Sequence, residues 1–185
     1  MNIFVLDHNP KIAAQLQCDK HVVKMIVESA QMLSTAHRML DGYTEKRPSK
    51  SGKRMINYWV HPNKDLENVL YKAVHHKHPC TIWTMESVYN YRWHYDHFCA
   101  LLDEYTYRYG KSHGTEKLKY WLAKPPKNIP RVPFTEFKLA MTHEPQCMHE
   151  GQTIRSYREY YQTKQDRFKM VWTKRPVPDW FKVAA

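Results

Sequence analysis

Apolar and polar residues recur along most of this chain with the period of an α-helix. Between residues 20 and 40 the apolar positions lie three or four residues apart, which places them on one helical face. Asp19 is a suitable cap for the start of this helix, and Asp41-Gly42 can end it. These apolar positions are Val22, Val23, Ile26, Ala30, Leu33 and Ala36.

A second long helix is predicted over about residues 80–109, followed by a stop at Gly110. We expect its large side chains to lie in the hydrophobic core. They are Ile82, Trp83, Val88, Tyr91, Tyr95, Phe98, Leu101, Leu102 and Tyr105.

Shorter periodic segments predict further helices at about 10–17, 62–71, 113–123 and 151–172. Four prolines make 124–133 irregular. Strand signals are weak, and residues 55–60 are the only serious candidate.

The pattern therefore predicts an all-α fold. We expect residues 1–185 to form a compact single-domain helical bundle on two long helices, with long irregular loops. Residues 43–61 are expected to form a basic loop, and 112–150 a proline-rich insertion of unknown role.

The charge of the chain indicates the kind of partner it binds. The chain has 29 Lys and Arg against 18 Asp and Glu, a net charge of +11 that favours polyanions. We expect damaged double-stranded DNA as the partner and a monomeric protein. The residues expected to contact DNA are Lys20, Gln31, Lys46, Arg47, Lys50, Lys53, Arg54, Arg108, Lys111, Arg155, Arg158, Tyr160, Tyr161 and Lys164.

The expected location is intracellular, in the host cytoplasm if the protein is viral. No stretch approaches the roughly 20 apolar residues of a membrane span. The amino end lacks a basic region typical of signal peptides. The four cysteines are scattered and have no paired spacing, which is typical of free thiols.

A polar stripe marks the first long helix as a candidate for chemistry. His21, Lys24, Glu28 and Gln31 follow one another at i, i+3, i+7 and i+10, so they share one face. A Glu flanked by Lys and His can stabilise a cation or move a proton. The alternative is an exposed face with salt bridges.

Three features of the chain resemble the phage pyrimidine-dimer DNA glycosylases, the endonuclease V family. Asp19-Lys20-His21 is followed, seven residues after the His, by Glu28. The second long helix ends in Arg108-Tyr109-Gly110, and an aromatic and basic segment spans 157–164. The likeness covers the amino end to Lys111 and the region near the carboxyl end.

The resemblance implies a DNA glycosylase with abasic-site lyase activity and no cofactor. An amine attacks C1′ of the damaged nucleotide, and the resulting imine permits β-elimination. By the same resemblance, Glu28 would stabilise the cationic sugar and move protons, with His21 and Lys24 holding Glu28 or a phosphate.

The identity of the amine stays open. The best-known family members carry a small residue after the initiator Met, and the Met is removed. Here that residue is Asn2, so the amine is that of Met1, that of Asn2 after processing, or the side chain of Lys24. An α-amine, with a pKa of roughly 7.7–8.0, is more often neutral than an exposed lysine.

Two other functions remain alternatives. A metal-dependent nuclease would use zinc ligands from a His and Cys set, although we predict no metal site. A non-catalytic nucleic-acid-binding protein would need only the charge. The residues of the metal alternative are Cys18, His21, His75, His76, His78 and Cys80.

Overall fold

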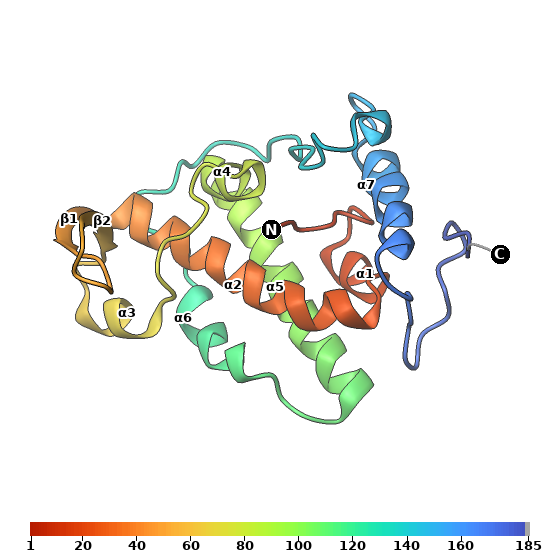
Figure 1. Ribbon diagram of the computed structural model, residues 1–185, viewed down its shortest axis with the longest axis horizontal. Helices are drawn as coiled ribbons and strands as arrows, with labels where there is room; N and C mark the ends of the chain where they lie inside the picture. The colour runs from red at the N-terminus through yellow and green to blue at the C-terminus, as the bar shows by residue number, and fades with distance from the viewer. Residues whose placement is uncertain (184–185) are drawn as a thin grey trace.

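Two long helices that pack against each other organise the computed structural model, which describes residues 1–183 (Figure 1). These are α2 (Asp19–Asp41) and α5 (Val88–Tyr109). The short α1 (Pro10–Gln15) packs on α5, and α4 (Pro79–Glu86) packs on both long helices. Asn9 caps α1 by accepting hydrogen bonds from its first backbone N–H groups, as expected of Asn before Pro.

The helix expected over 80–109 is in fact two helices, which meet at Ser87. This residue has extended backbone angles (φ −152°, ψ 145°) and ends α4. Its hydroxyl accepts from the Tyr89 N–H, so the same residue caps α5. Large apolar residues lie on both sides of this break, Trp83 before it and Val88 after it, so the pattern predicted one helix; Ile82, expected in the core, is exposed.

Three other predicted helices are also shorter than expected. The segment at 62–71 forms α3 (Lys64–Val69). The segment at 113–123 forms a 3-10 turn, η1 (Gly114–Leu118), and then α6 (Lys119–Leu122). The last helix, α7 (Thr153–Gln162), continues only as the 3-10 turn η3 (Thr163–Asp166).

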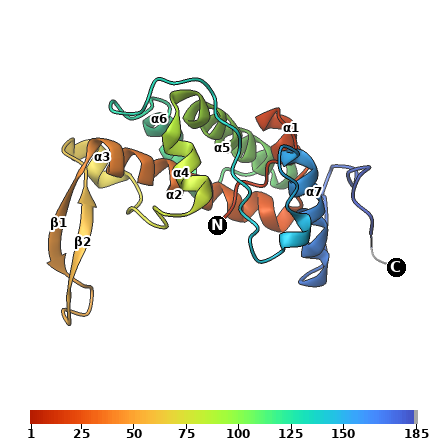
Figure 2. The same ribbon diagram turned by 90° about the horizontal axis from the view of Figure 1, so that it is seen from above.

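The prediction of an all-α fold was wrong, because the expected basic loop is a β-hairpin. Strands β1 (Tyr43–Pro48) and β2 (Met55–Val60) pair antiparallel, from Tyr43 opposite Val60 to Pro48 opposite Met55. Every residue of β1 is exposed, so no alternation of buried and exposed positions could reveal it. Figure 2 shows the hairpin projecting beyond the helices.

A buried arginine fixes the base of this hairpin. Arg38, in the last turns of α2, is 3% exposed. Its guanidinium forms an ion pair with Glu67 of α3 and donates to a ring of backbone carbonyls. Those carbonyls belong to Trp59, Glu67, Leu70 and Tyr71. One side chain thereby joins α2, the hairpin and α3, and satisfies acceptors that would otherwise be buried without partners.

The proline-rich region 112–150 is irregular apart from η1, α6 and the turn η2 (Pro145–Cys147). It is not a loose loop, because Ile129, Phe137 and Met141 enter the hydrophobic core. Among the helices of residues 1–183, none has both the length and the apolar character of a membrane-crossing segment.

Gly42 gives a test of the junction between α2 and the hairpin. A Cβ at this position would overlap the carbonyl oxygens of Arg38 and Val60, whereas a Cβ at Gly114 would meet nothing within 4 Å. We expect Gly42→Ala to lower the free energy of unfolding by about 1–3 kcal/mol, because backbone must move. Gly114→Ala should change it by less than about 0.5 kcal/mol. Urea unfolding of both variants measures the difference, and equal stabilities would contradict the described junction.

Candidate active site at the amino end

The face of α2 that carries the polar stripe opens into a cavity of about 460 Å³. Five parts of the chain form its walls: the first residues, α2, the start of α4, the insertion and the α7–η3 segment. The lining residues are Met1, Asn2, Phe4, His21, Lys24, Met25, Glu28, His78, Pro79, Ala140, Thr142, His143, Tyr160, Lys164, Arg167 and Phe168.

Glu28 is the one carboxylate among these described lining residues, and amines lie on both sides of it. Its Oε2 lies 3.7 Å from the amino nitrogen of Met1, and its Oε1 lies 3.4 Å from Nζ of Lys24. The Glu28 side chain is 12% exposed, while that of Lys24 is 66% exposed. The predicted stripe thus brings His21, Lys24 and Glu28 to one cavity, but Gln31 is not among its lining residues.

Asn2 holds the amino end in this position. Its backbone N–H donates to Glu28 Oε2 at 3.0 Å. Its side chain donates to the carbonyl of Ala140 and accepts from the N–H of Phe4. Phe4 has φ 53°, a conformation that costs an aromatic residue free energy and that the surrounding contacts must maintain. While Met1 is present, the nitrogen of Asn2 is an amide that positions the Met1 amine. Removal of Met1 would turn this nitrogen into an amine beside Glu28, so the alternative of an Asn2 amine stays open.

His21 is a neutral wall of the cavity. It is 6% exposed, stacks on Phe4, and has its Nδ1 2.7 Å from the hydroxyl of Tyr161. Burial, with added repulsion from Lys24 and Lys164, lowers the pKa of His21 to about 3. His21 therefore faces the cavity as a neutral ring near neutral pH, so a phosphate would meet it as a hydrogen-bonding group and not as a cation.

Lys164 brings a third amine to the cavity. It is 5% exposed, and its Nζ lies 3.4 Å from the ring centroid of Tyr160. Burial, and next the charge of Arg167, lower the pKa of Lys164 to about 8. Sequence reasoning named Lys164 and Tyr160 as DNA contacts, and both line the cavity. The lowered pKa of Lys164, which leaves part of this side chain deprotonated near neutral pH, is not predicted by the spacing of residues in the sequence.

Several cavity residues carried no usable signal in the sequence. His143 comes from the irregular insertion, and its Nε2 is 3.1 Å from the Tyr160 hydroxyl. Arg167 follows η3 and is exposed. Neither lies at a helical spacing from Glu28, so only the folded chain brings them together.

Two of the expected DNA contacts are structural instead. Arg108 is 3% exposed and forms ion pairs with Glu104 and Asp19, which link α5 to the start of α2. Tyr161 is fully buried, and its hydroxyl accepts from the Cys18 N–H. Both predictions were wrong because composition does not distinguish a surface cation from a buried, paired one.

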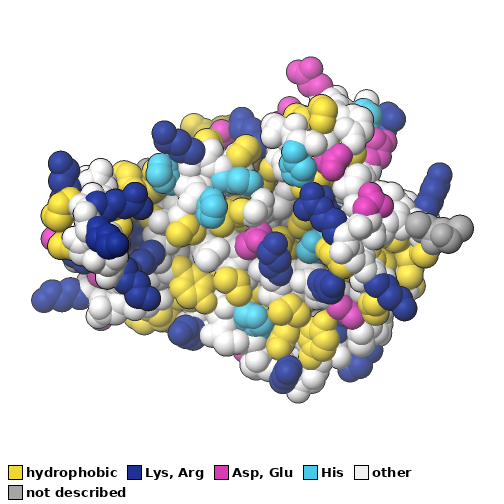
Figure 3. All heavy atoms as spheres, in the orientation of Figure 1, with side chains coloured by type: hydrophobic (Ala, Val, Ile, Leu, Met, Phe, Trp, Pro, Cys, Tyr) yellow, Lys and Arg dark blue, Asp and Glu magenta, His cyan; other side chains and the backbone are white. Residues whose placement is uncertain are grey.

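Most of the other expected contacts lie on the surface. Arg158 is half-buried, and its guanidinium donates to the Leu6 carbonyl. Figure 3 shows Lys and Arg side chains spread over the face on which the amino end lies, with fewer acidic ones. The exposed residues of the set are Lys20, Lys46, Arg47, Lys50, Lys53, Arg54, Lys111 and Arg155.

The metal ligands considered in the sequence do not converge. Within residues 1–183 the one group of three or more potential ligands consists of His37, Asp41 and His61. Cys18 and Cys80 are both buried, and burial raises the pKa of each thiol. A zinc site built from Cys18, His21 and the 75–80 segment therefore has no geometric basis.

No protein-family profile, curated protein or solved structure matches this chain. Its function is therefore inferred from the chemistry of the cavity. A carboxylate that faces amines in a cationic recess can stabilise a cationic sugar and exchange protons with a nucleophilic amine.

Buried neutral histidines make the stability of the fold depend on pH. Burial lowers the pKa of His97 to about 4 and that of His21 to about 3, from an ordinary 6.5. As the pH falls through about 6.5 the unfolded chain takes up both protons and the folded chain does not, so stability is lost. Each histidine should contribute roughly 1 kcal/mol per pH unit, or roughly 4 kcal/mol for the pair between pH 6 and 4.

Urea unfolding as a function of pH measures this loss. His97→Gln, which removes one of the two groups, should make the dependence on pH shallower. A free energy of unfolding that does not change between pH 6 and 4 would contradict the neutral, buried state of these rings.

Proposed function

We propose that this protein is a DNA glycosylase with abasic-site lyase activity on damaged duplex DNA, with pyrimidine dimers as the expected lesion. One observation carries the proposal: the amino nitrogen of Met1 lies 3.7 Å from the carboxylate of Glu28 inside a cationic cavity. The resemblance to the endonuclease V family supports the same reaction.

The reaction uses the Met1 amine as the nucleophile. In its neutral form it attacks C1′, the C1′–N bond to the base breaks, and the base leaves with a proton. Loss of the amine proton and ring opening give an imine, and removal of a C2′ proton expels the 3′ phosphate. Water then hydrolyses the imine and frees the amine. Glu28 would accept and return these protons and stabilise the cationic intermediates.

The cavity suits an extruded nucleotide. Its volume of about 460 Å³ falls within the range of small-molecule sites. Glycosylases reach their target by flipping the nucleotide out of the duplex. Lys24, Lys164 and Arg167 would meet the phosphates, while Phe4 and Tyr160 offer aromatic surface to the sugar or base.

The hairpin would hold the flanking duplex. It projects from the side of the molecule on which the amino end lies (Figure 2). Its exposed cations are Lys46, Arg47, Lys50, Lys53 and Arg54. Such cations bind the DNA backbone without reading its sequence, which leaves lesion recognition to the cavity.

Borohydride trapping tests the chemistry. We expect the wild-type protein to give a covalent adduct with abasic duplex DNA, because borohydride reduces the imine to a stable amine. Glu28→Gln should slow strand cleavage by at least about 100-fold while DNA binding is retained. Glu150→Gln, which makes the same change at an exposed Glu that is not a cavity-lining residue, is the matched control.

Peptide mapping of the adduct identifies the amine. We expect the modification at the amino end, and Lys24→Ala and Lys164→Ala should still form the adduct. An adduct on either lysine would overturn the assignment to Met1. A wild-type protein that binds DNA and gives no adduct or product would instead be a non-catalytic binder.

The salt dependence of binding tests the hairpin. Lys50→Ala/Lys53→Ala should weaken binding to any duplex and reduce the slope of log K against log salt by about 0.9 for each lost phosphate contact. Lys11→Ala/Lys117→Ala is the control. Lys11 lies in α1 and Lys117 in η1, which packs on α6, and Figure 2 shows α1 and α6 on the side opposite to that toward which the hairpin projects. Fluorescence anisotropy at several salt concentrations measures both. Equal slopes for the two double variants would contradict a role for the hairpin.

A further inference from the structure

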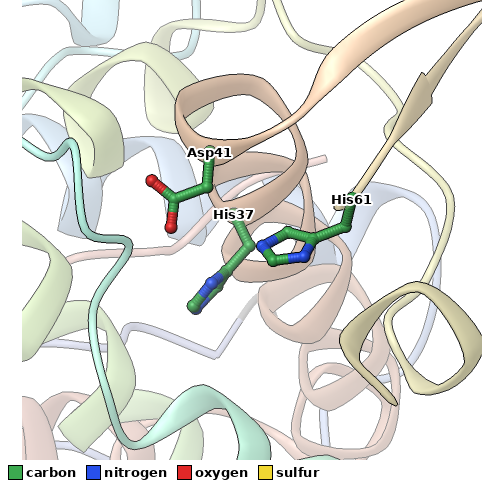
Figure 4. Close-up of side chains that lie close together, drawn as sticks. All are labelled: His37, Asp41 and His61. Carbon is green, nitrogen blue, oxygen red and sulfur yellow. The ribbon is translucent and has the colours of Figure 1, made fainter. Parts of the chain in front are cut away.

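A second cluster of polar side chains lies where the hairpin joins α2. His37 and Asp41 are one turn apart at the end of α2, and His61 directly follows β2. One ring nitrogen of each histidine and one carboxylate oxygen of Asp41 lie within 4.8 Å of one another. Figure 4 shows the three side chains side by side between the helix end and the hairpin.

Both histidines are buried, and each has a ring nitrogen without a partner. His37 is 3% exposed and His61 is 6% exposed. Nδ1 of His37 and Nε2 of His61 have no hydrogen-bond partner. Buried polar atoms without partners are rare in folded proteins, and here two histidines that carry such atoms lie beside a carboxylate, a set of donors that suits a metal ion.

The hydrogen bonds of His37 leave Nδ1 with a lone pair. Its Nε2 lies 2.9 Å from the Tyr91 hydroxyl, which donates its own proton to the Leu122 carbonyl. The hydroxyl oxygen then accepts from an Nε2–H of His37, while the ring also interacts with the backbone of Lys124. A neutral imidazole whose second nitrogen donates to a fixed oxygen is the usual state of a metal-binding His.

Hydrogen bonds from the insertion also fix the orientation of Asp41. One carboxylate oxygen accepts from the Lys127 N–H at 2.8 Å, and the other from the Asn128 N–H at 2.9 Å. Each oxygen retains lone pairs. The insertion thus holds this carboxylate beside the two rings.

His61 is the ligand that must change on binding. Its Nδ1 accepts from the Asn63 N–H at 3.1 Å, so in the neutral ring Nε2 carries the proton. When an ion binds Nε2, that proton leaves, Nδ1 takes one up, and the Asn63 hydrogen bond is released. Binding therefore requires a small adjustment of the turn after β2 and no change in the number of protons on the ring.

We propose that His37, Asp41 and His61 form a site for one divalent first-row transition metal ion, for which Zn²⁺ is the probe. Two imidazoles and one carboxylate favour such ions over Mg²⁺ and Ca²⁺, which prefer oxygen ligands. Water would complete the coordination. The ion would join the end of α2, the end of β2 and the insertion, and would fix the direction in which the hairpin projects. This inference does not depend on the proposed lyase activity.

Metal binding by the full chain tests the site directly. After metals are removed with a chelator, we expect isothermal titration calorimetry to show one Zn²⁺ ion bound per chain. Co²⁺ should give a visible absorption band that saturates at one ion per chain. Zn²⁺ should also raise the melting temperature, because an ion that binds the folded chain stabilises it. His61→Gln and Asp41→Asn should each weaken Zn²⁺ binding at least tenfold.

His94→Gln is the matched control. His94 is also buried and also has a ring nitrogen without a partner, but it does not belong to the cluster. This variant should bind Zn²⁺ as the wild type does, and circular dichroism checks that each variant is folded. Absence of one-equivalent binding to the wild type overturns the proposal. Folded His61→Gln and Asp41→Asn proteins that both bind Zn²⁺ like the wild type overturn it as well.

Discussion

The hydrogen bond from the Asn2 N–H to the Glu28 carboxylate is the contact on which the site depends. It joins the start of the chain to the middle of α2, and the amide of Asn2 extends the connection to the insertion at Ala140. A carboxylate in such a recess needs compensation, which the Met1 amine and Lys24 supply. The cavity exists because three distant segments are held around one charged group.

Charge in this protein has two separate uses. Arg38 and Arg108 lie in the interior, where each one joins several elements through ion pairs and carbonyls. A guanidinium suits this role because it stays charged and offers five donors in fixed directions. The exposed cations of the hairpin have few partners beyond the Arg47–Glu45 pair. Both buried arginines are balanced by the acidic residues with which they pair, so the net charge of +11 comes from cations outside these ion pairs.

Structure could be predicted from the sequence where buried positions repeat with the period of a helix. The apolar face of α2, apart from the exposed Val23, and the stripe of His21, Lys24 and Glu28 followed from spacing alone. The hairpin did not, because β1 buries nothing and is held by backbone pairing. The neutral state of His21 and the lowered pKa of Lys164 arise from burial by other segments, which spacing does not encode. His37 and His61 likewise come together only because the hairpin brings the chain back to the end of α2.

The position of the amino end has a practical consequence for preparing the protein. Residues added ahead of Met1, such as an affinity tag or the remnant of its cleavage site, would turn the primary amine into a peptide N–H. They would also have to leave through a recess in which the Met1 side chain is only 3% exposed. Recombinant material should therefore carry its purification tag elsewhere, and its first residue should be verified by intact mass before any assay is interpreted.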